Sequence, residues 1–182
     1  RGRLILTGIG AEPLGSVLAA MRRTGVRVET GRDWVGIDAS GPLKPTDVVA
    51  EVFPGFPTDL QAPLGAFLAT VPGTSTVRDD VYPDRFTHVE ELRKAGARMR
   101  LEAGVLTIEG RPLTGATMHA SDIRAGGALI VAALAAHGTS EVSGVRYVDR
   151  GYENVAGRLV ELGAKVKRVA REPRLVVTGT YG

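Results

Sequence analysis

The run Pro54-Gly55-Phe56-Pro57-Thr58-Asp59-Leu60-Gln61-Ala62-Pro63 is the most informative part of the sequence. Its prolines at 54 and 57 fix φ and remove backbone donors, so no helix can pass through them. Thr58 and Asp59 are good N-cap residues, and apolar residues follow them at helical spacing: Leu60, Leu64, Phe67 and Leu68. The run therefore predicts a rigid loop-to-helix corner that presents the Asp59 carboxylate to a cleft.

A second corner of the same kind follows later in the chain. Ser121-Asp122-Ile123-Arg124-Ala125 aligns with residues 58–62 and precedes an apolar helical pattern at Leu129, Ile130, Val131 and Leu134. Self-similarity of this sort is the signature of internal repeats. We expect each repeat to place a polar group at the start of a helix.

Three segments share another pattern, in which an amphipathic helix is followed by two strands. Each helix ends at a glycine, as expected where a helix C-cap requires positive φ: Gly25, Gly96 and Gly163. The strands that follow are predicted at residues 26–29 and 34–37, 97–101 and 105–108, and 164–169 and 175–177, the last pair joined by a turn near Pro173.

The second and third segments also carry a front half, which consists of a strand, the capped helix and another strand. The predicted strands are residues 48–52 and 75–77 in one segment and 116–119 and 140–142 in the other. Each front half leads through a tetrapeptide that ends in Asp-Arg, residues 82–85 or 147–150, into the amphipathic helix. A full unit therefore reads βαβαββ.

These repeats predict one α/β domain over residues 1–182, with units at about 1–46, 47–113 and 114–182. The first unit has only its back half, so one apolar face would lack a covering helix. The first residues of the chain already resemble a strand from the middle of a domain. We therefore expect residues upstream of Arg1 to complete the domain.

The composition excludes several classes of protein. Apolar residues make up 43% and charged residues 24% of the 182 residues, as in an ordinary soluble globular protein. No apolar run approaches the ~18 residues of a membrane span, and a net charge of +3 with 5% aromatic residues argues against a nucleic-acid partner. The absence of cysteine excludes disulfides and thiolate sites and is compatible with a cytoplasmic location. The histidines His88, His119 and His137 are scattered, so we expect structural roles and no metal site.

Three arginines stand near the predicted helix starts. Arg85 and Arg150 occupy equivalent positions, and Arg124 lies in the first helical turn after Asp122. Guanidinium groups beside free helix N–H groups suit phosphate or carboxylate ligands. Taken singly, each arginine is better explained by a surface ion pair. The set of three, together with Asp59 and Asp122, favours a single anion-binding site.

Five motifs, in order along nearly the whole chain, together resemble the UDP-N-acetylglucosamine enolpyruvyl transferase (1-carboxyvinyltransferase) family. They are the run 54–62, Arg85-Phe86, Leu113-Thr114-Gly115-Ala116, residues 122–125 and Asp149-Arg150-Gly151-Tyr152-Glu153. The resemblance is to the C-terminal domain and implies the enolpyruvate transferase fold, an inside-out α/β prism of βαβαββ repeats.

The resemblance also implies an activity. The family transfers the enolpyruvyl group of phosphoenolpyruvate to the 3′-hydroxyl of UDP-N-acetylglucosamine and releases phosphate, the first committed step of peptidoglycan synthesis. It implies no cofactor and no metal. The expected partners are the two substrates and the N-terminal half of the same enzyme, so we expect the chain alone not to turn over.

Two acidic residues gain catalytic roles by the resemblance. Asp59 matches the carboxylate that contacts the sugar 3′-hydroxyl and is proposed as its general base, and Asp122 matches the second acidic group. A base for the hydroxyl is what addition across an enol ether requires.

The resemblance also implies substrate contacts for five residues. Val81 and Tyr82 stand where the family binds the UDP-sugar, largely through the backbone. Arg85 and Arg124 match arginines near the phosphoenolpyruvate carboxylate. Arg150 matches a catalytic arginine that reaches phosphate as the enzyme closes.

Two other functions remain open. The sister enolpyruvyl transferase that acts on shikimate 3-phosphate shares the fold and the phosphoenolpyruvate chemistry, although the Phe-Pro-Thr-Asp-Leu-Gln run and the Asp-Arg-Gly-Tyr-Glu run argue against it. The chain could also be a non-catalytic βαβαββ binding module, in which the acidic residues only cap helices.

Overall fold

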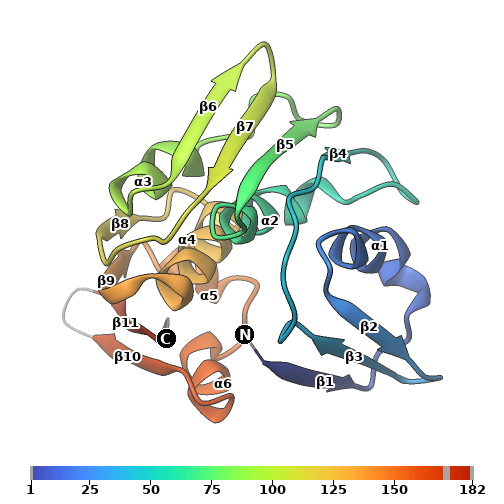
Figure 1. Cartoon of the computed structure of the whole chain (residues 1–182). Helices are drawn as coiled ribbons and strands as arrows, with labels where there is room; N and C mark the ends of the chain where they lie inside the picture. Colours follow the sequence, from blue (N-terminus) through green and yellow to red (C-terminus); the bar gives the residue numbers. More distant parts are fainter. Residues whose placement is uncertain (1, 170–172, 181–182) are drawn as a thin grey trace.

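The computed structural model describes residues 2–169 and 173–180. Three sheets lie around two central helices, α2 (Gln61–Leu68) and α4 (Ile123–Ala135), as Figure 1 shows. The sheets have orders β1-β3-β2, β4-β5-β7-β6 and β8-β9-β11-β10. In the two four-stranded sheets the first two strands are parallel and the other neighbours antiparallel.

The second and third units have the same order of strands, and the third has one additional short helix, α5. The second unit comprises β4 (Val48–Ala50), the 3-10 turn η2 (Thr58–Leu60), α2, β5 (Gly73–Asp79), α3 (His88–Lys94), β6 (Arg98–Glu102) and β7 (Val105–Gly110). The third comprises β8 (Thr117–His119), α4, β9 (His137–Ser143), α5 (Arg146–Asp149), α6 (Val155–Glu161), β10 (Lys165–Val169) and β11 (Arg174–Thr180). In both, a helix connects two parallel strands, as parallel pairing requires.

The first unit contains β1 (Arg3–Thr7), η1 (Glu12–Leu14), α1 (Gly15–Arg23), β2 (Arg27–Thr30) and β3 (Trp34–Asp38). Its sheet matches the last three strands of the other units and has no counterpart of β4 and α2 within the described residues. The predicted partial unit therefore agrees with the topology.

The strands differ from the sequence prediction at their starts. β5 begins at Gly73 and β9 at His137, whereas the expected strands began at residues 75 and 140. The extra residues are in register with neighbours, Gly73 with Gly110 and His137 with Thr180, so pairing lengthens both strands at their starts. A turn was predicted near Pro173. Pro173 lies in a turn, and residues 170–172 are outside the described residues.

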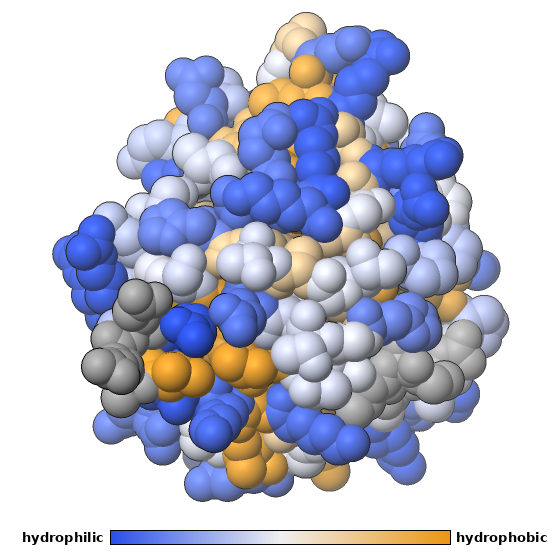
Figure 2. All heavy atoms as spheres, turned by 90° about the vertical axis from the view of Figure 1, so that its left-hand side faces the viewer, coloured by the Kyte–Doolittle hydropathy of each residue, from blue (hydrophilic) through white to orange (hydrophobic). Residues whose placement is uncertain are grey.

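The two central helices form the core. Their sequences, QAPLGAFL and IRAGGALIVAALA, are apolar around most of the helix circumference, which is typical of buried helices. Small residues such as Ala66, Ala128 and Ala132 are fully buried and let the two backbones approach closely. The two four-stranded sheets pack against these helices, β5 and β7 against α2 and β8, β9 and β11 against α4. The face in Figure 2 is mostly hydrophilic, with apolar atoms gathered in its lower part.

An apolar groove remains open between α1, α2 and α4. Its lining is almost entirely apolar: Val17, Met21, Phe56, Leu60, Pro63, Leu64, Phe67 and Val131. The groove lies beside the first unit, which has no counterpart of α2 or α4 among the described residues. Across residues 2–169 and 173–180, none of the helices has the length and apolar character of a membrane span.

Candidate functional site

Asp59 lies at the predicted corner, but its environment differs from the expectation. It sits in the 3-10 turn η2 that enters α2, after Pro57 in an extended conformation. Neither η2 nor α2 has a side-chain N-cap, so the predicted capping by Thr58 and Asp59 is wrong. The reason is that both side chains have other partners: the Thr58 hydroxyl donates to Asp79, and the Asp59 carboxylate accepts from arginines.

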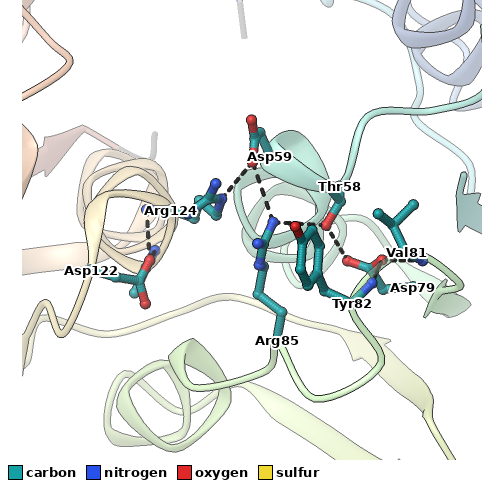
Figure 3. A network of polar contacts seen from close by, with 9 residues as sticks. Thr58, Asp59, Asp79, Val81, Tyr82, Arg85, Asp122 and Arg124 are labelled. Atoms are coloured by element: carbon teal, nitrogen blue, oxygen red, sulfur yellow. Dashed lines mark hydrogen bonds and ion pairs between the residues drawn. The ribbon is translucent and has the colours of Figure 1, made fainter. Parts of the chain in front are cut away.

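Two arginines from different elements converge on one oxygen of Asp59 (Figure 3). Arg124 Nε, in the first turn of α4, lies 2.5 Å from Asp59 Oδ1, and Arg85 Nη1, in the loop before α3, lies 3.3 Å from the same atom. The Asp59 side chain is 64% exposed, and its Oδ2 accepts no hydrogen bond from the described residues. The corner therefore combines two cations with a carboxylate oxygen that is open to a ligand.

Arg85 is held by more than its ion pair. Its Nη1 donates to Thr58 Oγ1 at 3.0 Å, and its guanidinium carbon lies 3.8 Å from the centre of the Tyr82 ring. A guanidinium stacked on an aromatic face gains electrostatic attraction from the ring quadrupole. These contacts and the 20% exposure of the Arg85 side chain give it a defined orientation beside Asp59.

The loop predicted to bind a sugar nucleotide is organised by a buried carboxylate. Asp79 Oδ1 accepts hydrogen bonds from Val81 N at 3.0 Å and Tyr82 N at 2.8 Å. These N–H groups are therefore already paired within the protein. Backbone recognition at Val81 and Tyr82 would have to use their carbonyl groups, and the Tyr82 carbonyl already accepts from Arg85 N.

Asp122 caps α4, as predicted. Its Oδ1 accepts from Arg124 N at 2.8 Å and Ala125 N at 3.0 Å, and its Oδ2 accepts from the hydroxyls of Thr87 and Ser121. Partial burial raises the pKa of Asp122, but the hydrogen bonds outweigh burial and leave the pKa below its ordinary value. Asp122 is therefore ionised at neutral pH, and the cap fixes the helical turn that carries Arg124.

Arg150 lines a hollow together with Asp122, Ile123, Arg124 and Tyr147. Its guanidinium forms no hydrogen bond or ion pair with the described residues, so it is free to meet an anion. Arg150 stands ahead of the amphipathic helix α6, which begins at Val155, as expected, but residues 146–149 before it form the separate helix α5, which the sequence did not predict.

The neighbouring acid, Asp149, is bound elsewhere. It accepts two hydrogen bonds from Arg168, at 2.6 and 2.7 Å, which lower its pKa. The side chain of Asn154 caps α6 in its place.

The three histidines differ in burial. His88 is 1% exposed, whereas His119 and His137 are exposed. Burial lowers the pKa of His88 to about 4, so its ring is neutral at physiological pH. Among residues 2–169 and 173–180, no group of three or more His, Asp or Glu side chains could hold a metal ion.

A comparison with protein-family models identifies the chain. Residues 1–159 match the model described as EPSP synthase (3-phosphoshikimate 1-carboxyvinyltransferase). The chain belongs to this enolpyruvyl transferase family. The family resemblance predicted from the sequence is thereby confirmed.

Individual relatives agree with this assignment. UDP-N-acetylglucosamine 1-carboxyvinyltransferase of Thermus thermophilus is 52% identical over 166 residues, which cover 91% of this chain and 39% of the relative. The chain thus spans about two fifths of the length of that curated relative. Since such relatives are named for 1-carboxyvinyl transfer, the chain is by resemblance a member of an enzyme family.

Solved structures confirm the predicted fold. The enolpyruvyl transferase NikO from Streptomyces tendae has a TM-score of 0.83 at 31% identity, and the match covers 91% of this chain and 40% of NikO. EPSP synthase from Acinetobacter baumannii has a TM-score of 0.74 at 19% identity, covering all of this chain and 42% of that one, which shows the fold alone.

Sequence reasoning missed Asp79 and the hydroxyl role of Thr58. Asp79 lies in an ordinary alternating strand, and its partner Thr58 is 21 positions away, so no local pattern links them. A signal was present in the composition of the strand, because Asp at the inward-facing end of β5 is unusual for a buried position.

Proposed function

We propose that this chain carries part of the active site of an enzyme that transfers the enolpyruvyl group of phosphoenolpyruvate to the 3′-hydroxyl of UDP-N-acetylglucosamine and releases phosphate. The observation that carries the proposal is the convergence of Arg85 and Arg124 on Asp59 Oδ1. The printed name of the Thermus thermophilus relative supports the choice of acceptor. By the same reasoning, the reaction would be the first committed step of peptidoglycan synthesis.

In this proposal, Asp59 accepts the proton of the sugar hydroxyl through its open oxygen, Oδ2. The two arginines hold the carboxylate in place through Oδ1 and present donors to the carboxylate of phosphoenolpyruvate. Arg150, which is free of ion pairs with the described residues, supplies a further cation for phosphate. The sugar oxygen bonds to the enol carbon that bears phosphate while the neighbouring CH2 carbon takes up a proton, and loss of phosphate together with a proton from that carbon restores the double bond. In this sequence Asp59 takes the hydroxyl proton and the arginines hold the anionic groups.

In the same proposal, Asp122 holds the start of the helix that carries Arg124. Its four hydrogen bonds leave it ionised and fixed at the start of α4, where it sets the backbone of Arg124. A catalytic role for Asp122 beyond this rests on the family resemblance. We propose it as the second acidic group of the site on that basis.

We further propose that the rest of the site comes from a segment that this chain does not contain. The chain spans 39% of the Thermus thermophilus relative, and its open groove between α1, α2 and α4 is apolar enough to receive a helix. Phosphate contacts from that segment would complete the clamp. On this proposal the 182-residue chain alone has no turnover. The division of a single domain into three units also stays a prediction.

The test is phosphate release from phosphoenolpyruvate, measured with the complete enzyme and with this chain alone. UDP-N-acetylglucosamine and shikimate 3-phosphate are compared as acceptors, because the matching family model is described as EPSP synthase. Release by the complete enzyme with UDP-N-acetylglucosamine supports the proposal. Release only with shikimate 3-phosphate, or with neither acceptor, contradicts it, and release by the chain alone contradicts the part about a second segment.

A variant pair tests the role of Asp59. Asp59→Asn in the complete enzyme should lower kcat by about 10²- to 10⁴-fold, the usual contribution of a general base. Glu109→Gln is the matched control, since Glu109 is 60% exposed and ion-paired to Arg98 at 3.4 Å on the outer face of its sheet. Equal kcat values for the two variants would contradict the role of Asp59 as the general base.

A further inference from the structure

Asp79 is a buried carboxylate that joins two parts of the candidate site. It ends strand β5, is 1% exposed, and receives three hydrogen bonds from the described residues. Two come from the backbone of Val81 and Tyr82, and the third comes from the Thr58 hydroxyl at 2.5 Å. Burial of a carboxylate is costly unless hydrogen bonds compensate it, so this arrangement ties the three partners firmly to the strand.

The hydrogen bond from Thr58 has a fixed direction. A carboxylate only accepts, so the Thr58 hydroxyl must donate its hydrogen to Asp79 Oδ2. The lone pairs of Thr58 Oγ1 are then left to accept from Arg85 Nη1 at 3.0 Å. Asp79 therefore orients the hydroxyl that helps to hold the guanidinium of Arg85.

The same guanidinium reaches the candidate base. Arg85 Nη1 lies between Thr58 Oγ1 and Asp59 Oδ1, at 3.0 and 3.3 Å. Figure 3 shows the resulting series of contacts from Asp79 through Thr58 and Arg85 to Asp59. A displacement at Asp79 would consequently reach the carboxylate through two hydrogen bonds and one ion pair.

We propose that Asp79 is a positioning residue for the transferase reaction. It acts on Arg85 and Asp59 through Thr58, and on the loop of residues 81–85 through the two backbone N–H groups. The inference rests on the proposed function, because positioning has meaning only if Asp59 and Arg85 contact substrate. Asp79 itself is buried and acts through these partners.

The variant Asp79→Asn separates the effect on Thr58 and Arg85 from the effect on the backbone of the 81–85 loop. The asparagine Oδ1 can still accept from Val81 N and Tyr82 N, but its Nδ2 group faces Thr58 and can only donate. Thr58 Oγ1 then receives donors from both asparagine and Arg85, and its own hydrogen loses its acceptor. The backbone of the 81–85 loop is therefore kept, whereas the Thr58 hydroxyl loses the charged acceptor that fixes its direction, and its hold on Arg85 weakens.

The kinetic expectation in the complete enzyme is a fall in kcat of about tenfold, the size of one charge-assisted hydrogen bond. KM for the sugar nucleotide should change by less than about threefold because the 81–85 backbone is kept, whereas KM for phosphoenolpyruvate should rise, since Arg85 presents donors to its carboxylate. If Asp79 had a purely structural role, Asp79→Asn would instead lower the melting temperature and leave kcat unchanged at temperatures where the variant is folded. That last result would overturn the proposal.

Variants of Thr58 test the route of the effect. Thr58→Val removes the hydroxyl and should lower kcat as Asp79→Asn does, whereas Thr58→Ser keeps the hydroxyl and should stay within about threefold of the parent. Because both residues act through one contact, the double variant should lose about tenfold and not about a hundredfold. Fully additive losses would contradict the proposed route.

Asp47→Asn is the matched control for the carboxylate. Asp47 directly precedes β4, and its carboxylate accepts from Thr76 N at 2.8 Å and from the Thr76 hydroxyl at 2.7 Å, with no hydrogen bond to Arg85 or Arg124 among the described residues. It should keep the parent kcat. A loss equal to that of Asp79→Asn would show that any amide substitution at this sheet has the same effect, and would overturn the proposal.

A structural readout keeps this test separate from the proposed function. In the isotopically labelled chain, Asp79→Asn should shift the side-chain ¹⁵N signals of Arg85, and Asp47→Asn should leave them in place. If the complete enzyme has no transferase activity, the proposed function fails, and the Arg85 signals still decide whether Asp79 orients that side chain. Unchanged Arg85 signals in Asp79→Asn would overturn the positioning role whatever the activity.

Discussion

Replacement of His88 by glutamine should make the protein less sensitive to mild acid. His88 is 1% exposed, its Nε2 has no hydrogen-bond partner among the described residues, and burial lowers its pKa from 6.5 to about 4. Above about pH 6.5 the ring is neutral in both the folded and the unfolded chain. Below that pH the unfolded chain takes up a proton that the folded chain excludes, so the free energy of unfolding falls until about pH 4.

The size of the effect follows from the two pKa values. Between about pH 7 and about pH 5, the difference in proton binding lowers the free energy of unfolding by about 2 kcal/mol through this residue alone. Asp122 attracts the imidazolium form and opposes the shift, but burial is the larger influence. His88→Gln has no titrating group there and should lose about 2 kcal/mol less than the parent over the same interval.

The assay is urea unfolding followed by circular dichroism at the two pH values. The change in unfolding free energy between them is compared across variants, so that any loss of packing in His88→Gln cancels. His119→Gln, at an exposed histidine, is the control and should show the acid sensitivity of the parent. If His88→Gln loses as much stability on acidification as the parent, burial of a neutral His88 is not the cause.

Four substitutions test the backbone and the core by the same urea unfolding assay. Asp122→Ala removes the α4 cap and should lower the free energy of unfolding by about 1 kcal/mol. Asp59→Ala removes no cap and should change it by less than about 0.5 kcal/mol. Equal losses would contradict the assignment of Asp122, and not Asp59, as a helix cap. Gly126→Ala should cost about 1–3 kcal/mol, because a Cβ there would overlap the Val148 side chain. Gly15→Ala has open space and helical φ, so it should be neutral or stabilise by up to about 1 kcal/mol, and a loss there would refute the packing argument.

Much of the fold could be predicted because it is encoded locally. The three glycines expected to end the amphipathic helices all have positive φ: +88° at Gly25, +85° at Gly96 and +89° at Gly163. Such positions depend on a single residue and its neighbours, so they are visible in the sequence. The matching order of strands in the two complete units follows from the same repeats.

The details of the site could not be predicted because they depend on contacts between distant residues. Asp59 and Asp122 occupy aligned positions, yet only Asp122 caps a helix, since Asp59 is drawn to arginines from two other segments. Likewise Asp149 binds Arg168, 19 positions away, and does not cap α6. The sequence indicated which residue types gather at the site, whereas tertiary packing determines which of them pair.

The shared use of one Asp59 oxygen by two arginines has a consequence for selectivity. Because Oδ1 already offers negative charge to both guanidinium groups, a further anion gains less from simple attraction than it would from two unpaired arginines. A halide has little more to offer than the oxygen already present. A planar carboxylate or a phosphate can engage two N–H groups of one guanidinium at once, which a single Asp59 oxygen does not do. The corner is therefore tuned to the shape of an anion more than to its charge.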